Sequence, residues 1–286
     1  MGHVAGRERY LRGMRIAVVG HVEHITLAAV PALPRPGDIL HLDAPRVFPG
    51  GGGGIAFYQL TRAPADLHLF TAIGSGDAGR FVADALAATR ARIHAAHRDE
   101  PHTRNVVLVT PEGERTILVV GAPQHPRRSD LLNWELLATC DAAYFTAQDP
   151  EALRAARAAR LLVVAARRRD VLARSGVRAD VVVGSTSDPR EVATLADFAV
   201  APGALVLTSG ARGGRVETAR GTTAFTTVPA ASVVGAYGAG DSFAGALVYY
   251  LATGLAPTDA AARAAAHGAA VLSGLVPIDN QLGFSG

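Results

Sequence analysis

Short apolar runs alternate along this chain with stretches whose apolar residues recur at helical spacing. The apolar runs have the length and β-branched content of buried strands. They cover residues 15–20, 67–73, 142–146, 161–165, 181–183 and 205–208. The helical stretches cover residues 54–60, 78–89, 151–160, 190–198 and 241–252. This succession predicts an α/β fold in which helices cover both faces of a mostly parallel sheet.

Two regions carry extended segments that do not fit this alternation. Residues 33–48 are broken by prolines and by the pair Gly37-Asp38, which favours short extended pieces outside the main sheet. Residues 102–121 contain two β-rich runs joined by the turn PEGE, the pattern of a hairpin. We expect the two regions to form a small β-lid inserted into the fold. An extension of the main sheet is the alternative.

The length and composition suit one α/β domain. Of the 286 residues, 49% are apolar, and we predict a single domain over residues 15–286 after a flexible leader, residues 1–14. No apolar run approaches the roughly 20 residues of a membrane span, and no signal peptide is recognisable. We therefore expect a cytoplasmic protein without a membrane partner. Cys140 lies among apolar residues and is interpreted as a buried structural thiol.

The chain contains no lysine, so all 28 of its Lys and Arg residues are arginines. This excludes a GxxxxGK[ST] phosphate loop, a Schiff-base lysine and the lysine of a protein kinase. The net charge is +3, but the arginines are scattered. Their densest run, residues 167–169, is short and lacks interleaved aromatics, so we interpret it as a solvated turn or helix end. We expect no nucleic-acid partner.

The strongest chemical signal is a cluster of glycines directly before an apolar helix. Gly238, Ala239 and Gly240 would present unobstructed backbone N–H groups at the start of this helix, a pattern typical of phosphoryl binding. Asp241 lies at the same helix start, where its carboxylate can accept the proton of a hydroxyl group. The alternative is that Asp241 only caps the helix.

A second glycine run, FPGGGGG at residues 48–54, also precedes a predicted helix. Such a run indicates that something must lie close against its backbone, although a plain flexible loop is the alternative. Glu23 follows the first predicted strand, and its carboxylate can accept hydrogen bonds from sugar hydroxyls. It can also be an exposed loop acid. His21 and His24 are interpreted as loop histidines.

These motifs resemble the ribokinase-like, or PfkB-type, carbohydrate kinase family, over about residues 15–277. The most specific is GAGDSF at residues 238–243, which is similar to the GAGDxF of the family. PGG at 49–51 and LPRPGD at 33–38 resemble its first glycine motif and its lid entry. Weaker similarities are GSGDAG at 74–79 and LTSGARG at 207–213.

The resemblance implies a three-layer α/β/α sandwich with a β-lid, and a homodimer formed through that lid. It implies ATP with Mg²⁺ as phosphoryl donor, a small sugar-like acceptor, and Asp241 as the base that deprotonates the acceptor hydroxyl. No residue is assigned as a direct metal ligand. The acceptor residues would be Glu23, Gly50, Gly51 and Gly52. The nucleotide residues would be Ser185, Asp188, Thr208, Gly210, Gly213 and His267, the last near the adenine.

Three departures from the family pattern affect these expectations. Gly52 and Ile55 stand where the family usually has Lys and Asn, so the acceptor pocket loses polar contacts. STSD at 185–188 replaces the NxxE motif that helps to organise Mg²⁺ and phosphates, and the shorter Asp188 would act through water. Gly235-Ala236 replaces the Asp-Thr of a monovalent-cation site, so we expect no activation by potassium.

Two alternatives to an active sugar kinase stay open at this stage. A sugar- or nucleotide-binding relative with weak catalysis is favoured by the altered NxxE motif. A dinucleotide-dependent oxidoreductase would also have α/β alternation and glycines. It is disfavoured because the first strand leads into GHVEH at residues 20–24 and not into GxGxxG.

Overall fold

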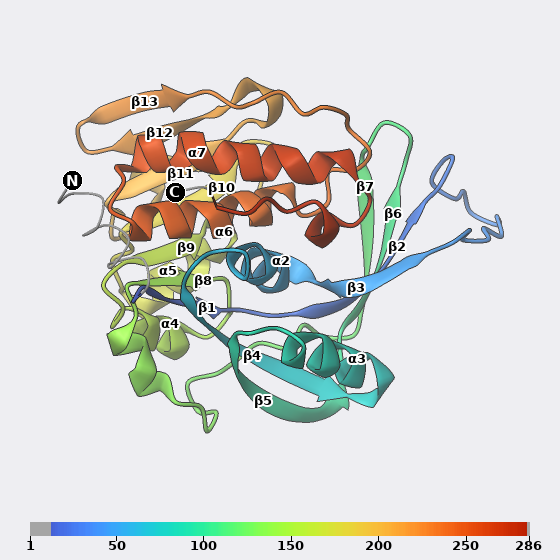
Figure 1. The fold of residues 1–286 in the computed structure, drawn as a ribbon, viewed down its shortest axis with the longest axis horizontal. Helices are drawn as coiled ribbons and strands as arrows, with labels where there is room; N and C mark the ends of the chain where they lie inside the picture. The colour runs from blue at the N-terminus through green and yellow to red at the C-terminus, as the bar shows by residue number, and fades with distance from the viewer. Residues whose placement is uncertain (1–12, 285–286) are drawn as a thin grey trace.

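A nine-stranded sheet lies at the centre of the protein, whose computed structural model describes residues 13–284 (Figure 1). The strand order is β13-β12-β11-β10-β9-β8-β1-β4-β5. Every neighbouring pair from β11 to β5 is parallel, whereas β12 and β13 are antiparallel additions at one edge. The strands are β1 (Arg15–Val19), β4 (Asp66–Ser75), β5 (Arg92–Pro101), β8 (Ala142–Phe145), β9 (Leu162–Ala165), β10 (Val181–Ser185), β11 (Ala204–Thr208), β12 (Gly214–Thr218) and β13 (Gly221–Phe225).

Helices cover both faces of this sheet, which confirms the predicted three layers. Successive side chains of a strand point to opposite faces. Ile16 and Val18 of β1 therefore pack in one hydrophobic cluster with α2, α3, α6 and α7. Ala17 and Val19 pack in a second cluster with α4 and α5. The helices are α2 (Gly51–Leu60), α3 (Gly76–Ala87), α4 (Pro150–Ala156), α5 (Arg169–Ser175), α6 (Ala239–Ala252) and α7 (Pro257–Ala270).

A second sheet of four strands, in the order β3-β2-β6-β7, projects from one side of the molecule (Figure 1). Its strands are β2 (Glu23–Ala29), β3 (Arg46–Gly50), β6 (Arg104–Val109) and β7 (Arg115–Val120). We call it the lid. The antiparallel pair β6 and β7 is the hairpin predicted for residues 102–121. A small cluster that includes Ile25, Val107 and Tyr237 joins the lid to the rest of the protein.

The first lid segment differs from its prediction. Residues 31–45 form turns and irregular chain, and only Arg46–Gly50 at the end of the predicted 33–48 is a strand. The main partner strand is β2, which the sequence analysis did not assign, because its residues follow β1 after a gap of only three residues and begin with polar side chains.

The helix predicted over residues 190–198 is wrong. The Asp188 side chain accepts a hydrogen bond from the Arg190 amide, which closes a local turn. Thr194 and Asp197 then form a capping box that starts a new 3₁₀ helix. Among the described residues the 3₁₀ helices are Trp134–Thr139, Ala166–Arg168, Leu195–Asp197, Gly210–Arg212, Val271–Ser273 and Pro277–Asp279.

The core extends to Met14, the last residue of the predicted leader. Residues 1–12 of that leader lie outside the described residues. Cys140 is buried as predicted, and burial raises the pKa of its thiol to about 12. In the part of the chain that the structure describes, no helix has both the length and the apolar character to cross a lipid bilayer.

Candidate active site

Loops at the carboxyl edge of the main sheet meet where the lid joins it, and ligands of open α/β sheets bind at this edge. β1 ends at Val19, and the chain passes through Gly20 to Glu23, the first residue of lid strand β2. β8 ends at Phe145, and the amide of Thr146 then donates a hydrogen bond of 2.9 Å to the carbonyl of Val19. The acceptor residues inferred from the sequence therefore lie beside two neighbouring strand ends.

The glycine run forms the first turn of α2 and is not a plain flexible loop. Gly51 has φ +78°, and a Cβ atom there would lie 3.0 Å from the Cγ and Oε2 atoms of Glu23. A Cβ atom at Gly52 would lie 3.2 Å from Oδ1 of Asp241 and 3.6 Å from Oγ1 of Thr146. Larger residues here would displace either carboxylate. The run thus lets α2 begin against Glu23 and Asp241 together.

The predicted catalytic residues form the start of α6. Gly238 occupies the N-cap position with φ +79°, and a Cβ atom there would lie 2.8 Å from the side chain of Pro277. The helix has no side-chain cap, so Asp241 does not act as one. A Cβ atom at Gly240 would meet no atom within 4 Å, so the first turn of α6, which begins with Ala239, is open. An anion can approach its free amides.

Asp241 is partly buried at this helix start. Burial raises the pKa of its carboxyl above the usual value of 3.8, and the charges of Arg167 and Arg115 oppose that rise. Arg115 belongs to lid strand β7, so the lid contributes to the electrostatics of the site. A raised pKa makes the carboxylate a stronger proton acceptor, as general base catalysis requires.

Glu23 is 7% exposed and faces the same region from the lid. It comes just past β1, as expected, and it is also the first residue of lid strand β2, where it pairs in register with Gly50 of β3. Its Oε2 accepts a hydrogen bond of 2.6 Å from Nδ2 of Asn105, and its Oε1 lies 3.8 Å from Nε2 of His21. Burial is the largest influence and raises the pKa of Glu23 to about 7. Near neutral pH this carboxyl can therefore both donate and accept hydrogen bonds.

Three further polar side chains at this place were not assigned from the sequence. The rings of His21 and His125 meet edge to face with centroids 4.7 Å apart. Nδ1 of His21, both ring nitrogens of His125 and Oδ1 of Asn105 are buried without a hydrogen-bond partner. Burial lowers the pKa of His125 to about 3, so its ring is neutral. His21 could have been suspected because it follows β1, but nothing in the sequence marks His125.

The arginine run at residues 167–169 is not simply solvated. Arg167 donates hydrogen bonds to Asp188 at 2.6 Å and Glu191 at 2.9 Å. Arg168 is half-buried, and its Nε donates a hydrogen bond of 2.9 Å to the carbonyl of Thr146. The run does lie at a helix end, as expected, because a 3₁₀ helix and the start of α5 meet there. Its side chains, however, bind other groups of the protein.

The nucleotide residues inferred from the sequence lie at the neighbouring strand ends. Ser185 of β10 pairs in register with Thr208 of β11. Gly210 and Gly213 follow in the turn after β11, with φ +58° and +80°. Asp188 is bound by Arg167 and Arg190, and the hydrogen bond from Arg190 is the largest of the influences that bring the pKa of Asp188 to about 2.

His267 lies apart from this group. It is 3% exposed on α7, with Nε2 3.2 Å from the hydroxyl of Tyr250 and its ring 4.6 Å from the ring of Phe284. Burial lowers its pKa to about 4, so the ring is neutral in the core. A role of His267 beside adenine stays a prediction.

The residues fit a nucleotide phosphate better than a metal ion held by protein alone. The uncapped start of α6 and the open space at Gly240 suit a phosphoryl group. Asp188 and Glu191, by contrast, are both paired with Arg167 and are not free metal ligands. Within residues 13–284 no group of three His, Cys, Asp or Glu side chains has the arrangement of a metal site. Magnesium fits here only as a companion of bound phosphates.

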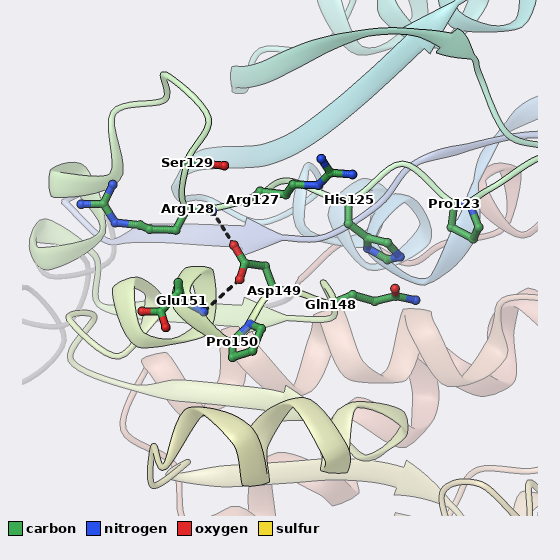
Figure 2. A pocket seen from close by; sticks show the side chains of 9 residues that line it. All are labelled: Pro123, His125, Arg127, Arg128, Ser129, Gln148, Asp149, Pro150 and Glu151. Atoms are coloured by element: carbon green, nitrogen blue, oxygen red, sulfur yellow. Dashed lines mark hydrogen bonds between the residues drawn. The ribbon is translucent and has the colours of Figure 1, made fainter.

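A surface cavity of about 690 Å³ lies next to these residues (Figure 2). His125 belongs both to its wall and to the ring contact with His21. Gln148 comes from the loop after β8, close behind Thr146 in the chain. The cavity is lined by Pro123, His125, Arg127, Arg128, Ser129, Gln148, Asp149, Pro150 and Glu151.

Solved structures of sugar kinases share this fold. The ribokinase of Thermotoga maritima has 17% sequence identity and a TM-score of 0.75, with 94% of this chain and 96% of that chain covered. The ribokinase of Arabidopsis thaliana, complexed with ribose and ATP, has 16% identity, a TM-score of 0.72 and the same two coverages. Phosphofructokinase-2 from Escherichia coli, in complex with substrates and products, has 16% identity, a TM-score of 0.71 and coverages of 91% and 93%.

Sequence comparison identifies the family more directly than these distant structures, whose low identities show only a common fold. No curated protein sequence matches the chain. A family model described as pfkB family carbohydrate kinase matches residues 14–279, nearly the whole of the described chain. The resemblance seen in the GAGDSF and PGG motifs is thereby confirmed. The chain belongs to the pfkB family of carbohydrate kinases, which are ATP-dependent enzymes.

Proposed function

We propose that this protein transfers the γ-phosphoryl group of ATP to a hydroxyl group of a small sugar-like acceptor, with Asp241 as the general base. The observation that carries the proposal is the position of Asp241. Its Oδ1 lies 3.2 Å from the point where a side chain would begin at Gly52, so the missing side chain leaves room beside the carboxylate. The start of α6 offers free amides next to the same carboxylate.

The chemistry follows from these positions. Asp241 accepts the proton of the acceptor hydroxyl as its oxygen attacks the γ-phosphorus, and the bond to the β-phosphate oxygen breaks to leave ADP. The amides around Gly238, Ala239 and Gly240 stabilise the negative charge on the transferred group. Mg²⁺ would arrive with ATP, where it neutralises phosphate charge. The nucleotide would lie along Ser185, Thr208, Gly210 and Gly213. Because ATP is the phosphoryl donor, we also propose that the protein is cytoplasmic, which cell fractionation tests.

The test is ADP release with ATP, Mg²⁺ and a panel of sugars, sugar acids, sugar phosphates and nucleosides. We expect acceptor-dependent ADP release, and Asp241→Asn should lower kcat by roughly 10² to 10⁴ with little change in the KM for ATP. Asp259→Asn is the matched control, because Asp259 is an exposed first-turn aspartate of the neighbouring helix α7. Equal activity of Asp241→Asn and wild type would refute the proposal.

A second candidate is a sugar- or nucleotide-binding protein with weak catalysis. It is favoured by Asp188, whose carboxylate is occupied by Arg167 and Arg190 at 2.6 and 2.9 Å and so is not free to organise phosphates. Ligand-induced thermal stabilisation without turnover on any acceptor would support this candidate over the kinase.

We also propose that the lid forms a homodimer contact. Every residue of edge strand β7 is exposed, and its apolar residues Ile117, Leu118, Val119 and Val120 are 41 to 55% exposed. An apolar strand at an open sheet edge readily pairs with another chain. Light scattering should give a dimer for the wild type and a monomer for Val119→Asp. A monomeric wild type at micromolar concentration would contradict this proposal.

A further inference from the structure

Arg167 and Arg168, from the arginine run at residues 167–169, differ in their partners. Arg167 is neutralised, because it contacts the carboxylates of Asp188 and Glu191 at 2.6 and 2.8 Å. Arg168 makes one hydrogen bond, from Nε to the carbonyl of Thr146. Among residues 13–284, no carboxylate lies within ion-pair distance of Arg168, and its Nη1 and Nη2 groups make no hydrogen bond. Arg168 therefore brings a half-buried positive charge without an ion-pair partner among these residues, on which the charges of Asp170 and Glu23 act only from farther away.

This charge lies on the acceptor side of the site. Its anchor, Thr146, has its Oγ1 3.6 Å from the Cβ position of Gly52, the same point that lies 3.2 Å from Oδ1 of Asp241. The positive charge of Arg168 also acts on Glu23, His21 and His125: it adds to the burial that lowers the pKa of both histidines, and it opposes the burial that raises the pKa of Glu23. His21 contacts both the carboxylate of Glu23 and the ring of His125, so these three side chains are neighbours, and Arg168 lies close enough for its charge to act on all of them.

The neighbouring groups suit a polyhydroxylated ligand. Four buried polar atoms lack partners there, on His21, His125 and Asn105. The cavity beside His125 adds the side chains of Gln148 and Arg127, and Figure 2 shows His125 and Gln148 at the same end of it. Among the described residues Arg127 has no ion-pair partner, but the wall also carries Arg128 and the carboxylates of Asp149 and Glu151, so the cavity as a whole adds no net positive charge.

A partly desolvated guanidinium without a counter-ion is unfavourable, and a bound anion removes that cost. The planar fork of arginine suits two oxygens of a carboxylate or phosphate. We propose that the acceptor carries an anionic group, a phosphate ester or a carboxylate, and that Nη1 and Nη2 of Arg168 bind it. Glu23, Asn105, His21 and His125 then receive the hydroxyl groups of the same molecule. This inference rests on the proposed kinase function and names its substrate class.

An alternative role for Arg168 would be to hold the phosphates of ATP. The two roles predict different results. If Arg168 serves the acceptor, its loss affects charged acceptors and spares neutral ones. If it serves ATP, its loss weakens ATP binding and affects all acceptors equally.

The test is isothermal titration calorimetry without ATP, on the full-length protein, with matched neutral and anionic ligands. The pairs are ribose with ribose 5-phosphate, fructose with fructose 6-phosphate, and glucose with gluconate and glucuronate. We expect at least one anionic ligand to bind at least tenfold more tightly than its neutral partner. Phosphate esters and carboxylates form separate arms, so the result also identifies the anion.

Substitution of the arginine gives the decisive comparison. Arg168→Gln should weaken the preferred anionic ligand by about 10- to 100-fold and leave its neutral partner and ATP within about threefold. Arg168→Lys should give an intermediate loss, because it keeps the charge and loses the fork. Arg169→Gln is the matched control in the same arginine run, since Arg169 only donates to the carbonyl of Val192. Circular dichroism checks that each variant is folded.

Three outcomes would overturn the inference: no anionic ligand binds more tightly than its neutral partner, the preference survives Arg168→Gln, or the substitution weakens ATP instead. None of these touches the proposed function, which fails separately if no acceptor stimulates ADP release or if Asp241→Asn is fully active. A neutral sugar that wild type phosphorylates more efficiently than any anionic acceptor, and that Arg168→Gln phosphorylates equally well, would refute the inference and support the kinase.

Discussion

The two sides of the site at the carboxyl edge of the sheet differ in how their polar groups are used. The acceptor side comprises Glu23, Gly51, Gly52, His21, Asn105, His125, Thr146 and Arg168. The nucleotide side comprises Ser185, Thr186, Asp188, Thr208, Ser209, Gly210 and Gly213. On the acceptor side the guanidinium of Arg168 has no carboxylate partner among the described residues, and several buried polar atoms have no hydrogen-bond partner. Within residues 185–213 as the structure describes them, no buried side-chain atom lacks one.

The nucleotide side satisfies its polar groups internally. Thr186 Oγ1 lies 3.1 Å from the carbonyl of Thr208 and 3.0 Å from Oγ of Ser209. Asp188 is bound by two arginines. Polar groups that already have hydrogen-bond partners gain little when a ligand binds. Buried polar groups without partners favour a ligand that supplies the missing hydrogen bonds. Selectivity should therefore depend on the acceptor side more than on the nucleotide side.

Among the tests that compare the two sides, the largest effect is expected from filling the space at Gly52. Gly52→Ala would place a methyl group 3.2 Å from Oδ1 of Asp241 and displace the carboxylate or the acceptor. We expect kcat/KM for the acceptor to fall by about 100-fold, while the KM for ATP changes little. Gly283→Ala is the control, because a Cβ atom there meets no atom within 4 Å. A rise in the KM for ATP alone would break the division into two sides.

A smaller effect concerns stability and arises from Glu23. Burial raises its pKa from 4.5 to about 7, so between these values the folded protein keeps a proton that the unfolded chain releases. The free energy of unfolding should therefore fall as pH rises through this window, by about 3 kcal/mol in full. Glu23→Gln cannot ionise, and its stability should vary less with pH.

The measurement is urea denaturation of wild type and Glu23→Gln at pH 5 and pH 8. The variant should gain stability relative to wild type at pH 8, and the two should be closest at pH 5. Glu135→Gln, at an exposed position, controls for the loss of a carboxylate. Parallel pH profiles for wild type and Glu23→Gln would show that Glu23 does not titrate in this window.

The smallest effect is expected on the nucleotide side. Arg190 is 70% exposed, and its ion pair with Asp188 should contribute at most about 0.5 kcal/mol to stability. Arg190→Gln leaves Asp188 paired with Arg167, so we expect kcat and the KM for ATP within about threefold of wild type. Steady-state kinetics and thermal denaturation check both. A loss of about 100-fold would show that this side depends on the geometry of Asp188 as strongly as the acceptor side depends on Gly52.

The sequence was sufficient for those parts of the site that are local. Glycines before an apolar helix predicted a phosphoryl site at Asp241, and the structure has an open, uncapped helix start there. The strand alternation predicted the layers because each buried strand carries its apolar run in its own residues. Strand β5 was not predicted, since its residues RIHAAHRDEP have no such run.

The remaining part of the site depends on contacts between distant segments. Arg168 looked like part of a solvated run, and only the fold brings its Nε to the carbonyl of Thr146, 22 residues away in the chain. His125 meets His21 across more than a hundred residues of sequence. Asn105 reaches Glu23 only because β6 pairs with β2 in the lid. No local pattern encodes such meetings, so sequence reasoning missed all three residues.

The pairing of Glu23 with Gly50 in the lid has a wider consequence. Glu23 lies against Gly51, and Gly50 leads directly into the turn whose Gly52 lies beside Asp241, so the lid cannot shift without altering the shape of the space there. Occupancy of the pocket and the position of the lid are then thermodynamically coupled, and the coupling is reciprocal. A molecule that binds the outer surface of strands β2 and β3 and immobilises them will therefore change the affinity for the acceptor. The acceptor will change the affinity for that molecule by the same factor.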